Sequence, residues 1–269
     1  MAFAYLTILR PINSIMAAIA VYIASLVAGM PASPDILVIY AMLSVFFVSG
    51  AGMVINDIFD VEIDRVNRPE RPLPSGRISL NAAKAYAAVL FAAGIAIGFL
   101  VNATAFAIAT AASLLLVAYA WKLKKMMLVG HAAVSMLVAL SFIYGGIVNG
   151  NHAPVLPLAA LAFLANMGRE IYKSVDDMMG DGQHGVTSLA VKYGVNKART
   201  VAAALLLLAI MFSFVPFGLG IFGYVYMLFA IVADMVFLAA IAMTGKSAKL
   251  CKIAMNVALI AFLAGVLAK

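Results

Sequence analysis

Two short segments hold most of the acidic side chains of this apolar chain and several of its basic ones. The first reads N-D-I-F-D-V-E-I-D-R-V-N-R-P-E-R-P-L-P-S-G over residues 56–76, and the second reads R-E-I-Y-K-S-V-D-D-M-M-G-D over residues 169–181. Charged groups are costly in an apolar protein unless something binds them. We therefore interpret the two segments as the two halves of one site for magnesium and a diphosphate.

The acidic residues recur at helical spacing. If the helix continues, Asn56, Asp60 and Asp64 are successive i, i+4 neighbours on one face, and Asp177 and Asp181 repeat that spacing. Like charges stacked in this way repel, and a divalent cation relieves the repulsion. Magnesium prefers oxygen ligands and is usually held by one or two carboxylates plus substrate phosphates, whereas no H-E-x-x-H or C-x-x-C pattern indicates zinc. The predicted metal is magnesium or manganese.

Basic side chains accompany the acids. Arg binds phosphate oxygens bidentately and Lys supplies a point charge, so both suit a diphosphate leaving group. Prolines flank Arg68 and Arg71 and stiffen their loop, and Lys173 shares a helical face with Asp177. A third group, Tyr119, Lys122 and Lys124, ends a predicted span on the same side of the membrane.

The rest of the chain indicates a polytopic membrane protein. Of its 269 residues, 66% are hydrophobic and 11% are charged, and the mean hydropathy is +1.10; a typical soluble domain has about 25% charged residues. A membrane-spanning helix needs about 20 apolar residues. Gly, Pro, Asn and charged residues divide the chain into nine such runs, at 12–29, 36–57, 83–101, 104–121, 128–148, 155–173, 199–216, 221–243 and 250–268.

The basic residues predict how these spans are oriented. All but one of the 18 Lys and Arg residues fall on one side of the nine-span arrangement, and only Lys269 falls on the other. Because short cytoplasmic loops are enriched in Lys and Arg, we expect the N-terminus and both polar segments in the cytoplasm and the C-terminus outside. The same bias attracts anionic lipids, so the net charge of +7 gives no reason to expect nucleic-acid binding.

These motifs resemble those of the UbiA superfamily of intramembrane prenyltransferases. The resemblance rests on N-D-I-F-D-V-E-I-D followed by R-P-E-R-P-L-P-S-G, on the later D-D-M-M-G-D, and on the nine predicted helices. It covers residues 1–269 as a single transmembrane prenyltransferase domain. The opening L-R-P-I-N and the R-E-I-Y-K segment look most like the archaeal branch that makes digeranylgeranylglyceryl phosphate, an ether-lipid precursor.

The resemblance implies an all-α fold of nine helices around a central cavity, with a small cytoplasmic cap of loops. It implies metal binding by Asn56, Asp60 and Asp64, joined by Asp177 and Asp181 as further catalytic carboxylates. It also implies diphosphate binding by Arg68, Lys173 and either Lys122 or Lys124, with Tyr119 beside them and Asn13 as a further polar contact. The family's usual Tyr-x-x-x-Lys is not met at Tyr119, which leaves the lysine open, and Ser174 stands where these lipid synthases often carry an acid.

The leading hypothesis is magnesium-dependent transfer of a geranylgeranyl group from an isoprenoid diphosphate to the hydroxyl of geranylgeranylglyceryl phosphate, in a cell membrane. One alternative is prenyl transfer to an aromatic ring, such as 4-hydroxybenzoate, in a quinone, chlorophyll or haem pathway. A third possibility, from another class, is a cation-coupled secondary transporter. That class predicts charged or broken helices near the membrane midplane, where this sequence has only Asp234.

Overall fold

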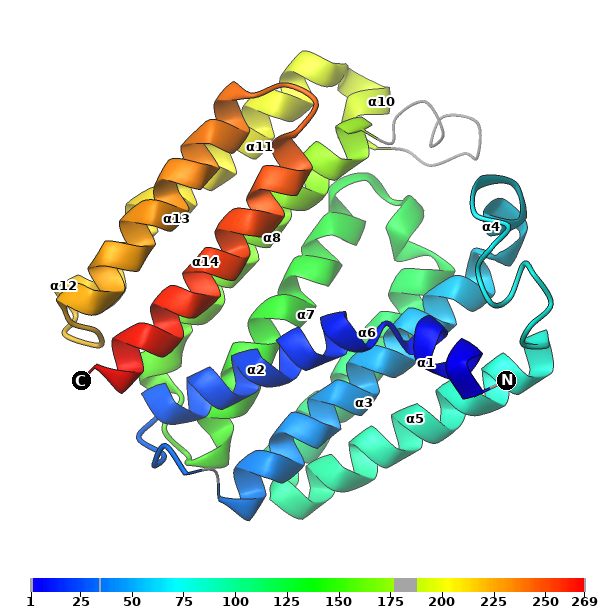
Figure 1. Cartoon of the computed structure of the whole chain (residues 1–269), viewed down its shortest axis with the longest axis horizontal. Coiled ribbons are helices and arrows are strands. Elements are labelled where there is room, and N and C mark those ends of the chain that lie inside the picture. Colours follow the sequence, from blue (N-terminus) through cyan, green and yellow to red (C-terminus); the bar gives the residue numbers. More distant parts are fainter. Residues whose placement is uncertain (1, 34, 177–187, 269) are drawn as a thin grey trace.

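The protein is a bundle of helices, seen in a computed structural model that describes residues 2–33, 35–176 and 188–268 (Figure 1). No strand occurs among these residues. The long helices are α2 (Pro11–Val27), α3 (Ile36–Phe59), α5 (Leu80–Val101), α6 (Ala103–Trp121), α7 (Met127–Val148), α8 (Leu156–Asp176), α11 (Val195–Phe212), α13 (Tyr224–Ala242) and α14 (Ser247–Leu267). Shorter elements connect them: α1 (Ala2–Leu9), α4 (Val61–Asn67), η1 (Leu123–Lys125), η2 (Ala153–Val155), α10 (Leu189–Tyr193) and α12 (Val215–Gly218).

Each of the nine predicted spans coincides with one long helix, but the predicted number of spans is too high by one or two. By length and composition, 7 described helices are able to cross a membrane, and α1 with α2, bent by 52°, would make 8. The remaining long helix, α8, does not meet the same criterion of length and composition, because its last two turns carry Arg169, Glu170, Lys173 and Asp176. The helix that the prediction counted as an ordinary span therefore has a strongly polar end.

Polar residues fix where several helices begin. The side chains of Asp35, Ser79, Asn102 and Ser188 accept hydrogen bonds from backbone N–H groups in the first turns of α3, α5, α6 and α10. These groups have no partner within the helix, so a capping side chain stabilises the start. Asn102 also ends α5, which makes the turn between α5 and α6 a single residue.

Six helices surround the centre of the molecule. Along the ring, α2 packs on α3, α3 on α6, α6 on α7, α7 on α8, α8 on α14, and α14 returns to α2. Helices α2 and α7 also meet directly, through Gly145, where an added Cβ would lie 2.2 Å from the carbonyl oxygen of Val21. Helix α5 packs outside α3, and α11 and α13 pack outside α8 and α14.

The first polar segment and the described part of the second, residues 169–176, reach the same end of the bundle. In Figure 1, α4 and the loop after it, the connection from α6 to α7, helix α10 and the turn from α13 to α14 lie at one end, and the C-terminus lies at the other. We call the first the motif end. The basic residues that the sequence analysis assigned to one side of the membrane are therefore grouped at one end of the fold.

Candidate functional site

The first motif places a carboxylate next to a lysine from another helix. At the end of α3 the helical hydrogen bonds continue, from Asp60 N to Asn56 O at 3.0 Å and from Asp64 N to Asp60 O at 2.8 Å. Asn56 donates from Nδ2 to Asp60 Oδ2 at 2.9 Å, and Lys124 Nζ forms an ion pair with Asp60 Oδ1. The predicted i, i+4 relationship is confirmed for Asn56 and Asp60, whereas Asp64 follows the break at Asp60 between α3 and α4 and pairs with Arg71.

A second cluster of charges lies beside this pair. Asp57 Oδ1 accepts hydrogen bonds from Arg10 Nη2 at 2.5 Å and from Arg71 Nη1 at 3.5 Å, and Arg71 Nη1 also donates to Asp64 Oδ2 at 2.6 Å. Asp57 and Asp64 are both buried. Buried carboxylates need charged partners because their desolvation is expensive, and the two arginines provide them. Arg10 has a positive φ of 50°, at the bend between α1 and α2.

The loop after α4 is held by its own contacts. Ser75 Oγ donates to the carbonyl oxygen of Arg71 at 2.6 Å, Arg77 Nε donates to Ser75 Oγ at 2.9 Å, and Ile78 N donates to Pro72 O at 3.2 Å. Pro72 is buried. These bonds position Arg71 against α3, so the loop is built as a cap over the end of that helix.

A cavity of about 570 Å³ opens beside Asn56. Most of its charged and amide lining is at the motif end, where Arg10, Asn13, Asn56, Tyr119, Asn166, Arg169, Glu170, Lys173, Lys252 and Asn256 contribute. Farther from the motif end the lining is mostly apolar, with Val48, Leu116, Phe142, Leu161, Leu259 and Phe262, and its polar members there include Ser44, Ser213 and Asp234. A cavity with a charged end and an apolar interior is suited to an amphiphile, whose polar head would lie at the charged end.

The structure brings some of the predicted site residues to this cavity and places others elsewhere. Asn13, Asn56, Tyr119 and Lys173 line it, and Asp60 with Lys124 adjoins it through Asn56. Arg68 and Lys122 are exposed, and Asp64 faces Arg71. Asp177 and Asp181 lie outside the described residues.

The sequence left open whether Lys122 or Lys124 is the lysine of the predicted diphosphate site, and the structure favours Lys124. Lys124 is half-buried and contacts Asp60, whereas Lys122 is exposed. Lys122 ends α6, and η1 then turns the chain back so that Lys124 points toward the end of α3. The contact depends on this short turn, which the residue spacing alone did not reveal.

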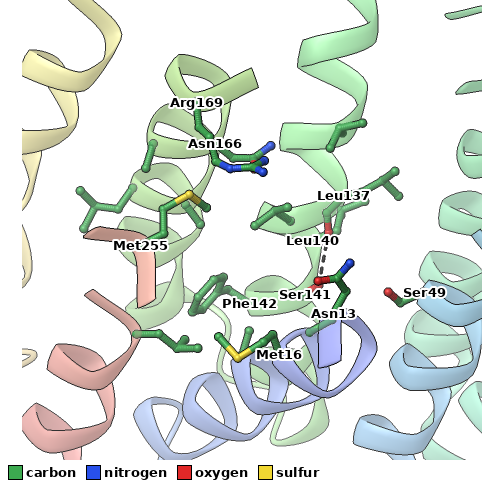
Figure 2. A pocket seen from close by; sticks show the side chains of 18 of the residues that line it. Asn13, Met16, Ser49, Leu137, Leu140, Ser141, Phe142, Asn166, Arg169 and Met255 are labelled. Atoms are coloured by element: carbon green, nitrogen blue, oxygen red, sulfur yellow. Dashed lines mark hydrogen bonds between the residues drawn. The ribbon is translucent and has the colours of Figure 1, made fainter. Parts of the chain in front are cut away.

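Other cavity residues were not individually predicted as site residues, although Arg169 and Glu170 belong to the second polar segment. On α8, Arg169 donates to Glu170 Oε1, and Asn166 donates from Nδ2 to Ser135 Oγ at 3.1 Å. Figure 2 shows the side chains of Arg169 and Asn166 reaching into the space that Asn13 enters from α2. The available signal was periodicity, since polar residues at 166, 169, 170 and 173 on α8, and at 252 and 256 on α14, recur three to four positions apart in otherwise apolar helices.

Two of the described residues offer oxygen ligands of the kind that a magnesium site uses. Asn56 and Asp60 lie side by side with oxygen atoms of the kind that magnesium prefers. Within residues 2–33, 35–176 and 188–268, no group of three or more His, Cys, Asp or Glu side chains is arranged to hold a metal ion. The donor chemistry of Asn56 and Asp60 fits an ion that completes its coordination with substrate phosphates and water.

The sequence as a whole matches known prenyltransferases. Residues 17–266 match the UbiA prenyltransferase family. The chain is similar to the digeranylgeranylglyceryl phosphate synthase of Methanothermobacter thermautotrophicus, with 41% identity over 97% of this chain and 95% of the relative. It is also similar to the synthase of the same name from Methanopyrus kandleri, with 38% identity over 98% and 99% of the two chains.

Solved structures show the same fold. A digeranylgeranylglyceryl phosphate synthase structure is 38% identical, with a TM-score of 0.85 over 100% of this chain and 99% of that one. A UbiA homolog from Archaeoglobus fulgidus, bound to GPP and Mg²⁺, is 18% identical, with a TM-score of 0.78 over 99% and 100% of the two chains. The family match over most of the chain and the relatives at about 40% identity agree with the cavity and motifs described above, and we conclude that this chain belongs to the UbiA prenyltransferase family.

Proposed function

We propose that this prenyltransferase moves a geranylgeranyl group from its diphosphate to the free hydroxyl of geranylgeranylglyceryl phosphate, using a divalent metal. The observation that carries the proposal is the contact of Asn56, Asp60 and Lys124 at the polar mouth of an apolar cavity. The named relatives support the identity of the acceptor, since they are digeranylgeranylglyceryl phosphate synthases of similar length.

The donor's diphosphate would lie at the motif end. Asn56 and Asp60 would hold the metal ion, together with the predicted ligands Asp64, Asp177 and Asp181. Bound magnesium would neutralise charge on the diphosphate and make it a better leaving group. Lys124 and Lys173 would contact phosphate oxygens directly, with Arg68 a further predicted contact, and Tyr119 and Asn13 would position the head of the donor.

The reaction exchanges one C–O bond for another. The allylic C–O bond of the donor breaks, and its electron pair leaves with the diphosphate. The acceptor's hydroxyl oxygen bonds to the same allylic carbon, forms an ether, and gives its proton to a base. Residues that stabilise the departing negative charge lower the barrier more than residues that only bind the donor.

The apolar part of the cavity would protect the developing carbocation. Val48, Leu116 and Phe142 line it beyond the polar mouth, where apolar side chains outnumber the hydroxyl groups and Asp234. Water in that space would capture the allylic cation and release an alcohol instead of an ether. Exclusion of water is therefore part of the chemistry that this lining provides.

The protein is a multi-pass membrane protein, and we place its motif end in the cytoplasm. The grouping of basic residues at that end supports this orientation, because cytoplasmic loops are enriched in Lys and Arg. The N-terminus would then be cytoplasmic and the C-terminus outside. In the transporter hypothesis Asp234 would bind a coupling ion, but it accepts a hydrogen bond from Ser213 Oγ at 2.7 Å between α11 and α13, and the family is one of prenyltransferases.

Mass spectrometry of the reaction products tests the proposal. The purified protein is incubated with geranylgeranyl diphosphate, Mg²⁺ and either geranylgeranylglyceryl phosphate or 4-hydroxybenzoate. The expected product is the doubly prenylated glyceryl phosphate in the first mixture. A prenylated benzoate in the second mixture and no ether in the first would instead identify an aromatic prenyltransferase.

A further inference from the structure

Basic and amide side chains also line the cavity on helices that carry none of the first motif. Arg169 comes from α8, and Lys252 and Asn256 come from α14. Lys252 and Asn256 are four residues apart, so they lie on the same face of α14, and that face continues with Leu259 in the apolar part of the cavity. From the motif end inward, the α14 face therefore changes from polar to apolar residues, as the α3 face that ends at Asn56 also does.

Arg169 has a donor without an acceptor. Its Nε is buried, and no described residue accepts a hydrogen bond from it, although Nη1 of the same guanidinium contacts Glu170. A buried N–H of a charged group that lacks a partner carries the unfavourable cost of its desolvation uncompensated. Figure 2 shows this side chain directed into the cavity. A ligand oxygen there would satisfy the Nε–H.

Lys252 lies where the cavity meets a second hollow. This hollow has a volume of about 250 Å³ and is lined by Lys252 and by residues 10–13 at the start of α2. Lys252 itself is exposed. Its ammonium group is accessible to a ligand head that sits between α2 and α14.

The charge balance on this part of the cavity favours an anion. Among the described residues that line the cavity, the carboxylates are Glu170 and Asp234, and the cations are Arg10, Arg169, Lys173 and Lys252. Glu170 pairs with Arg169 and lies 3.9 Å from Lys173 Nζ, and Arg10 pairs with Asp57. No carboxylate contact is found for Lys252 among the described residues.

We propose that Arg169, Lys252 and Asn256 bind the phosphate of the acceptor, a phosphomonoester joined to a lipid tail. The inference rests on the proposed function, which requires two anionic head groups in one cavity, the donor's diphosphate and the acceptor's phosphate. Lys124 and Asp60 act on the donor's diphosphate. Arg169 on α8, with Lys252 and Asn256 on α14, binds the acceptor's phosphate. Arginine and an amide donate to phosphate oxygens, lysine adds charge, and the acceptor's tail lies along Leu259 and Phe262.

Steady-state kinetics with Lys252→Met test this assignment. Loss of one charge-assisted hydrogen bond should raise the KM for geranylgeranylglyceryl phosphate by about tenfold or more, because each tenfold corresponds to about 1.4 kcal/mol. The KM for geranylgeranyl diphosphate should stay unchanged. With phosphate-free geranylgeranylglycerol as acceptor, wild type and variant should react equally. Arg169→Lys, which keeps the charge but removes the Nε–H, should also raise only the acceptor's KM.

Lys249→Met is the matched control, because it removes the same charge from the same helix outside the cavity lining. An unchanged acceptor KM in Lys252→Met, or a raised donor KM, would overturn the assignment while wild-type product formation still supports the proposed function. Absence of any ether product from the wild type would overturn both. Calorimetric titration of geranylgeranylglyceryl phosphate without donor gives a second readout, in which Lys252→Met should bind more weakly than Lys249→Met.

Discussion

Lys124 Nζ contacts Asp60 Oδ1, and this contact joins the turn after α6 to the end of α3. Both side chains are mostly buried, with 15% and 20% of their surface exposed. The pair places a phosphate-binding type of cation beside a metal-binding type of carboxylate. In the proposed reaction the donor's diphosphate and its metal ion would enter between these two groups.

Replacing Lys124 by Met should reduce turnover strongly. Loss of a charge that stabilises the leaving diphosphate should lower kcat by about 100-fold, in line with the ~10²–10³ effect of removing one transition-state donor. The measurement is kcat with geranylgeranyl diphosphate and geranylgeranylglyceryl phosphate.

Lys125→Met is the control for that variant, because Lys125 is an exposed neighbour in the same short turn. It should keep near-wild-type kcat. Equal losses in both variants would mean that the turn needs its net charge and that the contact with Asp60 has no special role.

Arg71→Met should destabilise the fold. The change leaves Asp57 with one arginine and removes the hydrogen bond to buried Asp64, so we expect a loss of about 3–5 kcal/mol in the free energy of unfolding. Arg65→Met removes an ion pair whose partners are 60% and 73% exposed, and it should cost at most about 1 kcal/mol. The unfolding of both detergent-purified variants is followed by circular dichroism. A smaller loss of unfolding free energy in Arg71→Met than in Arg65→Met would contradict the proposed role of the buried cluster.

Gly145→Ala should also be destabilising, because the new Cβ would lie 2.2 Å from the carbonyl oxygen of Val21 and would push α2 away from α7. Overpacking of this kind typically costs about 1–3 kcal/mol. Gly218→Ala is the control, since nothing lies within 4 Å of its added Cβ. The midpoint of thermal unfolding should fall in the first variant and stay within error in the second, and identical midpoints would show that α2 and α7 can separate at little cost.

Chelation of divalent metal should abolish turnover without unfolding the protein. Excess EDTA removes the ion that Asn56 and Asp60 are expected to hold, and added Mg²⁺ or Mn²⁺ should restore the rate. Product formation and circular dichroism are measured on the same samples. Full activity in EDTA would remove the metal from the proposed mechanism.

The sequence predicted the features that depend on local spacing. Apolar runs of about 20 residues located each long helix, and the i, i+4 spacing of Asn56 and Asp60 correctly placed them side by side at the end of α3. The same spacing singled out Lys173, and the family resemblance singled out Asn13; both line the cavity. The spans and the helical spacings follow from helix geometry, which a single segment determines.

Contacts between distant segments could not be predicted in the same way. The pairing of Lys124 with Asp60 spans 64 positions, and Arg10 with Asp57 spans 47. Arg71 was expected near phosphate, but it bridges Asp57 and Asp64. Lys252 and Asn256 were overlooked because polar residues at the start of a membrane helix usually signal only its boundary, and their position in the cavity depends on how α14 packs against α8 and α2.

Product formation by Asp60→Asn tests the central claim most directly. The substitution keeps the shape of the side chain and its distance to Asn56, but it removes the charge that Lys124 and a metal ion would share. With geranylgeranyl diphosphate, geranylgeranylglyceryl phosphate and saturating Mg²⁺, mass spectrometry should detect no ether product above background from the folded variant. A rate close to that of the wild type would contradict the assignment of this cavity as a metal-dependent prenyl-transfer site.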